Sequence, residues 1–587
     1  LADAPELLLR RQALAAMAAE RWGAAARILG DLIVKHPAAD HLAEYHFWRA
    51  EAFYRLGRLE MARRHYQRAE TAGADPVKCA YALGWCAYRE QRWEEALTQF
   101  EQARAGCRSC GFATDLALRR GNSLFNMGRL EAAAQAFAEA LELAEARRET
   151  LLVAEASFRH AWALLRSDSF DEAARAFADI RLREGRTRDA AEALYWEGQA
   201  YFRQADYRAA QERLLALLEH PGTTDSLRAR ALLAVGDAYF NQEQPGEALE
   251  WYRRILEAPG ADRRLRLTAH ESLFECRTAR GEWDQAYAVL GEIEERFPET
   301  QGTGDRYLTV ADGFFRDGRY VDALESYGDF LESAHPEDPR TLRVRYQMAV
   351  ARVQIGQRAQ AASAFEALGE REFHYQSEAL IKAGMLRLEL GQPEEALTSL
   401  EMRLSLHLTP REEVVTRAYL AEAYQRLGEM PAARTEWEKV ATAESAVSDS
   451  LRATASLQLG RLAFADREWS AAHRRFAAAE SLGLPGRVYR GAYWAGEAAY
   501  RSGDTLRATE WLEQFLRAGE EEALWEATAR IRLAECYEGL GREEKAREQY
   551  ERVLELPLQE HSFQEEARRR LVQMGELPPP HSGEDTP

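Results

Sequence analysis

Four of the six cysteines are close together in the sequence, and their side chains could carry several kinds of chemistry. Cys79, Cys86, Cys107 and Cys110 fall within 32 residues, and the last two form a C-x-x-C. Such a group could bind zinc, attach haem or form a disulfide. Haem attachment needs a histidine directly after the motif, where this chain has Gly111. Zinc binding, a disulfide and free thiols remain.

Helix geometry excludes one zinc site made from all four thiols. Cys79 and Cys86 fall on one predicted helix, seven residues and therefore about 10 Å apart along its axis. Zn–S bonds of about 2.3 Å cannot span that distance. Cys79 lies near the start of its predicted helix. The loop that contains Cys107 and Cys110 is expected to come back to that same end of the helices. We predict no metal site. The general expectation is unpaired thiols, and the sharper hypothesis is a disulfide among Cys79, Cys107 and Cys110, either within the loop or to Cys79.

Other catalytic and cofactor-binding patterns are missing from the sequence. None of the five lysines follows a glycine as in a phosphate-binding loop, and no G-x-S-x-G elbow occurs. His270 and Glu271 lack the second histidine of the zinc-protease motif. His36, His41 and His46 are spaced by five, which turns successive rings around a helix, so we expect solvent-facing or interfacial histidines. The sequence predicts a protein without catalysis and without a cofactor.

Charge and hydropathy exclude two further classes. The 587 residues include 77 basic and 96 acidic side chains, which gives a formal charge of −19. Nucleic acid is not an expected partner, because phosphate binding needs a clustered basic surface. No stretch approaches 18 consecutive apolar residues, so the chain is not predicted to cross a bilayer. Hydrophobic residues make up 46% of the chain, enough for a large core.

The elements that position these side chains follow an internal repeat. One alanine recurs 15 times, at intervals of 34 to 40 residues. Recurrence at this period indicates stacked structural repeats. The alanines are Ala25, Ala62, Ala96, Ala133, Ala173, Ala210, Ala248, Ala286, Ala323, Ala361, Ala396, Ala433, Ala472, Ala508 and Ala546.

Each unit has the spacing of two antiparallel helices joined by a short turn. In most units a small residue precedes the alanine by twelve positions and a bulky one follows it by four, as in Gly121, Ala133 and Phe137. Small residues let the helices approach closely, and the ring fills the space beside that contact. Glycine often occupies the turn, and prolines such as Pro37 and Pro76 are expected to close the second helix of several units.

The small–aromatic–small pattern and the closing proline resemble the tetratricopeptide repeat family over roughly residues 6 to 556. The resemblance implies an all-α fold, a right-handed superhelical solenoid of about 15 helix–turn–helix repeats. The family's early tryptophan is usually missing here, and the repeats are longer than its usual 34 residues. We expect two solenoid halves, 1–298 with about eight repeats and 299–556 with about seven, then a capping helix (557–575) and a mobile tail (576–587).

In this family the first helices of successive units line an inner groove that binds peptides. By register, the residues expected to bind a partner are Phe47, Tyr54, Tyr81, Trp85, Tyr88, Trp162, Tyr195, Glu51 and Glu155. They would form an aromatic, acidic trough for an apolar segment with basic residues. The alternative is that the rings pack into neighbouring units. The family's basic clamp for a terminal carboxylate is not expected, because only Asn122 occupies a fitting place.

The resemblance implies a non-catalytic scaffold or adaptor of a multiprotein assembly, with protein partners. We expect a periplasmic or extracellular location in a bacterial cell envelope. This expectation rests on the start without Met, the C-x-x-C that could oxidise, and repeats as long as those of bacterial envelope tetratricopeptide proteins. The alternative is a cytoplasmic regulatory module that senses a peptide.

Overall fold

The computed structural model describes residues 4–107, 110–300, 302–335, 337–443, 448–482, 488–519, 522–558 and 561–575. The chain divides into two units, residues 1–300 and 301–587, and each is described by itself. All regular secondary structure in the described ranges is helical. None of the described helices is both long and apolar enough to cross a membrane.

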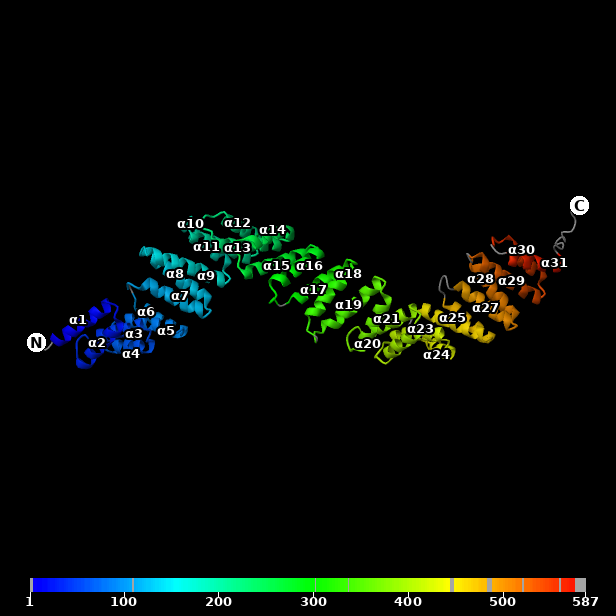
Figure 1. The fold of residues 1–587 in the computed structure, drawn as a ribbon, viewed down its shortest axis with the longest axis horizontal. Coiled ribbons are helices and arrows are strands. Elements are labelled where there is room, and N and C mark those ends of the chain that lie inside the picture. Colours follow the sequence, from blue (N-terminus) through cyan, green and yellow to red (C-terminus); the bar gives the residue numbers. More distant parts are fainter. Residues whose placement is uncertain are drawn as a thin grey trace. The chain divides into compact units, whose positions relative to one another are not determined.

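Unit 1 contains eight pairs of helices in chain order (Figure 1). They are α1 (Ala4–Ala18), α2 (Trp22–Lys35), α3 (Leu42–Arg55), α4 (Leu59–Thr71), α5 (Pro76–Arg89), α6 (Trp93–Gly106), α7 (Ala113–Asn126), α8 (Leu130–Ala146), α9 (Thr150–Arg166), α10 (Phe170–Glu184), α11 (Arg188–Arg203), α12 (Tyr207–Leu218), α13 (Asp225–Asn241), α14 (Pro245–Glu257), α15 (Arg263–Ala279) and α16 (Trp283–Arg296).

Unit 2 contains seven pairs and one further helix within its described residues. They are α17 (Thr303–Arg316), α18 (Tyr320–Ser333), α19 (Arg340–Gln354), α20 (Arg358–Gly369), α21 (Gln376–Glu389), α22 (Pro393–Leu404), α23 (Pro410–Leu427), α24 (Met430–Ala441), α25 (Asp449–Ala465), α26 (Trp469–Ser481), α27 (Val488–Arg501), α28 (Thr505–Ala518), α29 (Ala523–Gly539), α30 (Glu543–Glu555) and α31 (Ser562–Gln573).

Within each unit, every helix packs against the next one in the chain. First helices of neighbouring pairs are also in contact, for example α7 with α9 and α11 with α13. Side-chain contacts join α3 to α5, α5 to α7 and α9 to α11, so the first helices from α3 to α15 form one layer in unit 1. The predicted all-α class, with fifteen helix pairs and a C-terminal cap, is confirmed for the described residues.

The recurring alanine lies at the tightest contact of each pair. All fifteen are completely buried. The small residue on the first helix lies directly against the bulky ring of the second. A Cβ atom added at Gly121 would come within 2.6 Å of the Phe137 ring, and one at Gly236 within 2.5 Å of Tyr252. Only a hydrogen fits at these positions, as the spacing of small and bulky residues predicts.

The turn inside each pair places one residue in the left-handed region of φ. In nine pairs this residue is glycine, for example Gly428, which ends α23 with φ 82°. Glycine adopts this conformation without steric cost, which explains its recurrence there. One expectation about the helix ends is wrong, since Pro76 closes no helix. It is the first residue of α5, where the missing N–H costs nothing, and Asp75 caps the helix by accepting a hydrogen bond from the Val77 amide at 3.0 Å.

The last helix, α31, covers the final pair. It packs on α30 and buries Ala567 and Leu571 in the same cluster as Tyr550 and Val553. A terminal helix of this kind shields the apolar face that a stacked repeat would otherwise expose. Residues 559–560 of the expected cap and the expected tail, 576–587, lie outside the described residues.

Candidate partner-binding groove

A cavity of about 540 Å³ lies on the first-helix layer of unit 1, on α3, α5 and the start of α7. We call it the first cavity. Its lining residues are Phe47, Glu51, Tyr54, Arg55, Tyr66, Lys78, Tyr81, Ala82, Trp85, Phe112 and Asp115. Five of the nine residues predicted from the sequence are among them. Helical register alone brings these five together, because α3 and α5 are equivalent helices of adjacent pairs.

One wall of the first cavity is fixed by a ring from the alanine pattern. Tyr66 on α4 is buried, and its hydroxyl donates a hydrogen bond to Glu51 at 2.8 Å. Its ring meets Phe47 edge-on at 5.3 Å. Burial raises the pKa of Tyr66, with the Glu51 charge adding to the effect, so the phenol keeps its proton and remains a donor. Glu51 is thereby held at one position on α3.

The opposite wall joins α5 to α7. Phe112, directly before α7, stacks on Tyr81 with ring centroids 4.3 Å apart. The Tyr81 hydroxyl donates to Asp115 at 2.5 Å. Burial raises the pKa of Tyr81, and the hydrogen bond to Asp115 raises it further. The sequence analysis missed Phe112, because it lies in the loop before the helix and outside the repeated pattern.

Arginines also contact these rings and form ion pairs with these carboxylates. They are not among the binding residues predicted from the sequence. The Arg119 guanidinium lies 4.9 Å from the centre of the Trp85 ring, a cation–π contact. It also donates to Asp115 at 3.0 Å and lies 3.7 Å from Glu155. Glu51 accepts from Arg55 at 3.1 Å. The groove therefore has mixed charge, although the sequence reading gave an acidic trough. The spacing of Arg55 and Arg119, each four residues after its acidic partner, was the available signal.

A smaller cavity of about 410 Å³ lies further along the same layer, between the end of α7 and α9. We call it the second cavity. Its lining residues are Phe125, Phe158, Arg159, Trp162 and Arg166. Trp162, a predicted binding residue, also contacts Trp196 on α11, with ring centroids 4.3 Å apart. The remaining predicted rings line neither cavity. Tyr88 packs edge-on against Trp93 at 5.2 Å, and Tyr195 lies under Arg230 at 4.8 Å.

All nine predicted residues are half-buried. Each ring contacts a neighbouring helix, and part of its surface faces solvent. The rings therefore pack between units and keep part of their surface open to solvent. Asn122, the one residue that suited a carboxylate clamp, is buried with 4% of its surface exposed.

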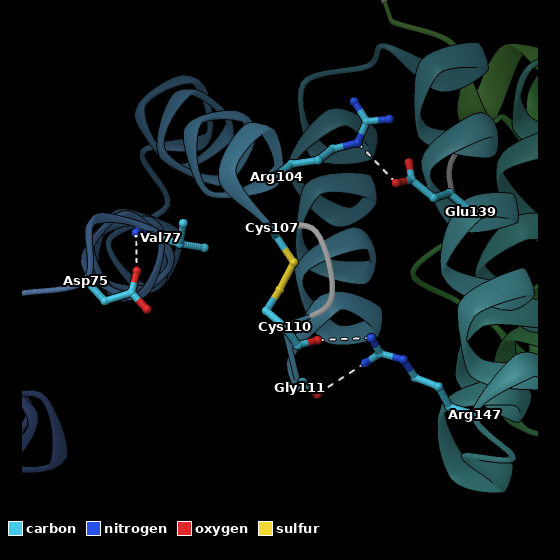
Figure 2. The surroundings of a disulfide bond; sticks show 8 residues. All are labelled: Asp75, Val77, Arg104, Cys107, Cys110, Gly111, Glu139 and Arg147. Atoms are coloured by element: carbon cyan, nitrogen blue, oxygen red, sulfur yellow. Dashed lines mark hydrogen bonds and ion pairs between the residues drawn. A yellow bond between two sulfur atoms is a disulfide. The ribbon is translucent and has the colours of Figure 1, made fainter.

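A disulfide closes the connection between α6 and α7 (Figure 2). Cys107 directly follows α6 and is joined by a disulfide to Cys110, two residues before Phe112; their Cα atoms are 5.5 Å apart. Arg147, the residue directly after α8, donates to the carbonyl oxygens of Cys110 at 3.0 Å and Gly111 at 3.3 Å. The disulfide and Arg147 together fix the segment that leads into Phe112. Arg108 and Ser109 lie outside the described residues.

The other cysteines near the groove are unreactive. Cys79 and Cys86 are free and buried on α5. Burial raises the pKa of Cys79 to about 11 and that of Cys86 to about 12, so both remain protonated thiols at neutral pH. No group of three or more His, Cys, Asp or Glu residues that could hold a metal ion occurs among the described residues.

Mass spectrometry can test the thiol states. We expect protein alkylated without reductant under native, oxidising conditions to retain a link between Cys107 and Cys110, since the loop brings them together. Cys79 should react only after unfolding, because it is buried and protonated. Modification of all six cysteines in the native protein would contradict this arrangement.

Family comparisons agree with the helical pattern. Residues 10–76, 118–181 and 195–262 match one tetratricopeptide repeat family, and residues 527–559 match a second. No curated protein sequence matches the chain. Tetratricopeptide repeats generally serve as protein–protein interaction scaffolds and are typically non-catalytic.

Several solved structures match the chain at low sequence identity. One is the C-terminal part of a repeat-containing protein from Cytophaga hutchinsonii, at 18% identity over 43% of this chain and 97% of that one, with a TM-score of 0.35. Another is a tetratricopeptide repeat protein from Parabacteroides merdae, at 15% identity over 45% and 96%, with a TM-score of 0.29. A third is Naa15/Naa10 bound to HypK-THB, at 14% identity over 97% and 83%, with a TM-score of 0.38.

The helix pairs carry one fully buried alanine each at the same position, and four segments match the family directly. In these four segments the chain is similar to the tetratricopeptide repeat family.

Proposed function

We propose that this protein is a non-catalytic scaffold that binds an extended segment of a partner protein along α3, α5, α7 and α9. The first cavity is the observation that carries the proposal. It is large enough for a bulky side chain, and six of its lining residues are aromatic. Aromatic rings contribute much of the binding free energy at protein interfaces, because they bury a large area and lose little conformational entropy.

The walls of the first cavity are already fixed before a partner arrives. Tyr66 holds Glu51, Tyr81 holds Asp115, and Phe112 stacks on the Tyr81 ring. A site whose side chains are held in place loses little entropy on binding. The partner segment would place an apolar or aromatic side chain against Trp85 and Tyr54, with basic residues beside the carboxylates. The formal charge of −19 favours the approach of basic partners over long distances, an effect that salt weakens.

We propose a periplasmic or extracellular location, with a cytoplasmic peptide-sensing role as the alternative. The disulfide between Cys107 and Cys110 supports the first, because such bonds persist in oxidising compartments. Fractionation of cells expressing the tagged full-length protein separates the two: recovery with periplasmic markers supports the envelope, and recovery with cytoplasmic markers refutes it.

Substitution of two tryptophans tests the groove. We expect Trp85→Ala and Trp162→Ala each to weaken partner binding by at least about 1 kcal/mol, because each removes a half-buried ring that lines a cavity. Glu51→Gln combined with Glu155→Gln should mainly reduce the salt dependence. Trp511, on second helix α28, provides the matched control: Trp511→Ala should matter less.

The measurement is affinity purification from native lysate, followed by titration of each recovered partner against every variant. Circular dichroism must show unchanged helicity. If both tryptophan variants bind the same partners with unchanged affinity, the rings serve packing alone and the binding surface lies elsewhere.

A further inference from the structure

Two arginines flank the aromatic second cavity on one helix. Arg159 and Arg166 are seven residues apart on α9, which places them on the same face, and Trp162 lies between them. Both arginines are exposed, while Phe125, Phe158 and Trp162 are half-buried behind them. The second cavity therefore has an apolar floor with a guanidinium at each end.

These two guanidiniums differ from the other arginines of the groove. Arg55 and Arg119 are ion-paired with Glu51 and Asp115, and Arg230 lies 3.5 Å from Glu192. Within the described part of the chain, no carboxylate forms an ion pair with Arg159 or Arg166; Arg166 lies 6.0 Å from the centre of the Phe125 ring. The positive charge of the second cavity is thus not neutralised, although acidic residues outnumber basic ones in the chain.

We propose that the second cavity binds a side-chain carboxylate of the partner segment, held by Arg159 and Arg166 next to an apolar group on Trp162. The planar guanidinium forms paired hydrogen bonds to a carboxylate, and the rings behind it exclude water from one side of that contact. This inference rests on the proposed function, because it assigns the chemistry of one end of the same partner segment.

The two cavities together give the segment a direction. The first cavity reaches α7 at Asp115 and the second at Phe125, ten residues and therefore about 15 Å along the helix. An extended chain covers that distance in about five residues. The first cavity contains carboxylates and the second contains uncompensated arginines. Because Glu51 and Asp115 of the first cavity are already paired with Arg55 and Arg119, the charges assign only one end of the partner segment: its acidic end lies toward α9.

A library of random peptides displayed on phage and selected on the full-length chain provides the probe. We expect selected peptides to share an Asp or Glu at a fixed distance from a bulky side chain. A synthetic selected peptide should bind at least about tenfold more weakly to the protein with Arg159→Glu and Arg166→Glu. Replacing the peptide's acidic residue by lysine should restore binding to that variant. A protein with Arg27→Glu and Arg186→Glu, which changes the same charge at exposed positions away from both cavities, should bind like the wild type.

The outcomes separate this inference from the proposed function. Suppose that Trp85→Ala weakens binding of the selected peptide while the charge reversal at Arg159 and Arg166 does not. The carboxylate assignment is then wrong, and the proposed binding function of the groove still stands. If neither change weakens binding, or if the library yields no binder, both proposals are wrong. A selected peptide that loses binding only when its C-terminus is amidated shows recognition of a chain terminus and overturns the side-chain assignment.

Discussion

Replacing Ala133 or Ala248 by leucine should cost about 1–3 kcal/mol of stability in the helix pair that contains it. Both alanines are completely buried at the contact between the two helices. The rings beside them, Phe137 and Tyr252, already lie so close to Gly121 and Gly236 that no Cβ fits there. Three additional carbon atoms must therefore push the helices apart or force side chains out of their preferred rotamers.

Hydrogen exchange followed by mass spectrometry is the suitable measurement, because a stacked repeat contacts only its neighbours and the loss will be local. Amides of α7 and α8 should exchange about 5- to 150-fold faster in Ala133→Leu. Ala472→Leu and Ala478→Leu give a matched comparison on α26, since the first position is buried and the second exposed. Equal exchange in that pair of variants would show that the assigned register is wrong.

The α3–α4 pair should lose stability in acid because of two buried histidines. Nδ1 of His46 and Nδ1 of His65 are 3.0 Å apart, and 8% and 3% of these residues are exposed. In the neutral pair, one Nδ1 donates the hydrogen bond and the other accepts it. Protonation of the accepting nitrogen would leave two N–H donors facing each other. Burial, then the nearby Arg49 charge, lowers the pKa of His65 from 6.5 to about 4. Burial and Arg68 lower the pKa of His46 in the same direction.

The direction of the effect follows from proton linkage. Between the unfolded value of 6.5 and the folded value of about 4, the unfolded state binds more protons than the folded one. The stabilisation by the neutral pair is therefore complete above pH 6.5 and is lost as the pH falls toward 4. Hydrogen exchange of α3 and α4 at several pH values, corrected for intrinsic rates, measures it. His65→Gln should flatten the dependence, while His407→Gln, at an exposed site, should not. An equal pH dependence in wild type and His65→Gln would refute this role.

The fold could be predicted well from the sequence because the same spacing of buried residues recurs in every repeat. One buried alanine per pair recurs fifteen times, and the bulky residue four positions later is aromatic in ten units and leucine in five. An error in the register of one unit is therefore corrected by the others. Pro76 shows where this logic fails. Its position near the end of one repeat suggested a helix end, yet the same residue can begin the next helix, and spacing alone does not distinguish these roles.

The groove was only partly predictable. Register identified Phe47, Tyr81 and Trp85, because first helices of adjacent pairs must lie side by side. It could not identify Phe112, which lies in a loop, or the guanidinium of Arg119 over Trp85, whose position depends on a flexible side chain. The His46–His65 pair also escaped notice, because the repeat brings these two positions together without fixing which side chains occupy them; Arg417 and Glu436 meet at the same positions of a later pair.

Photo-crosslinking tests most directly whether the first-helix face of unit 1 binds the partner. The photoreactive residue benzoylphenylalanine is placed at Arg55, an exposed position at the first cavity, and separately at Arg27 on second helix α2. The protein is irradiated with a peptide selected from the library. We predict a crosslink from position 55 that disappears in the Trp85→Ala background, and none from position 27. A crosslink from position 27 with none from position 55 would contradict the account.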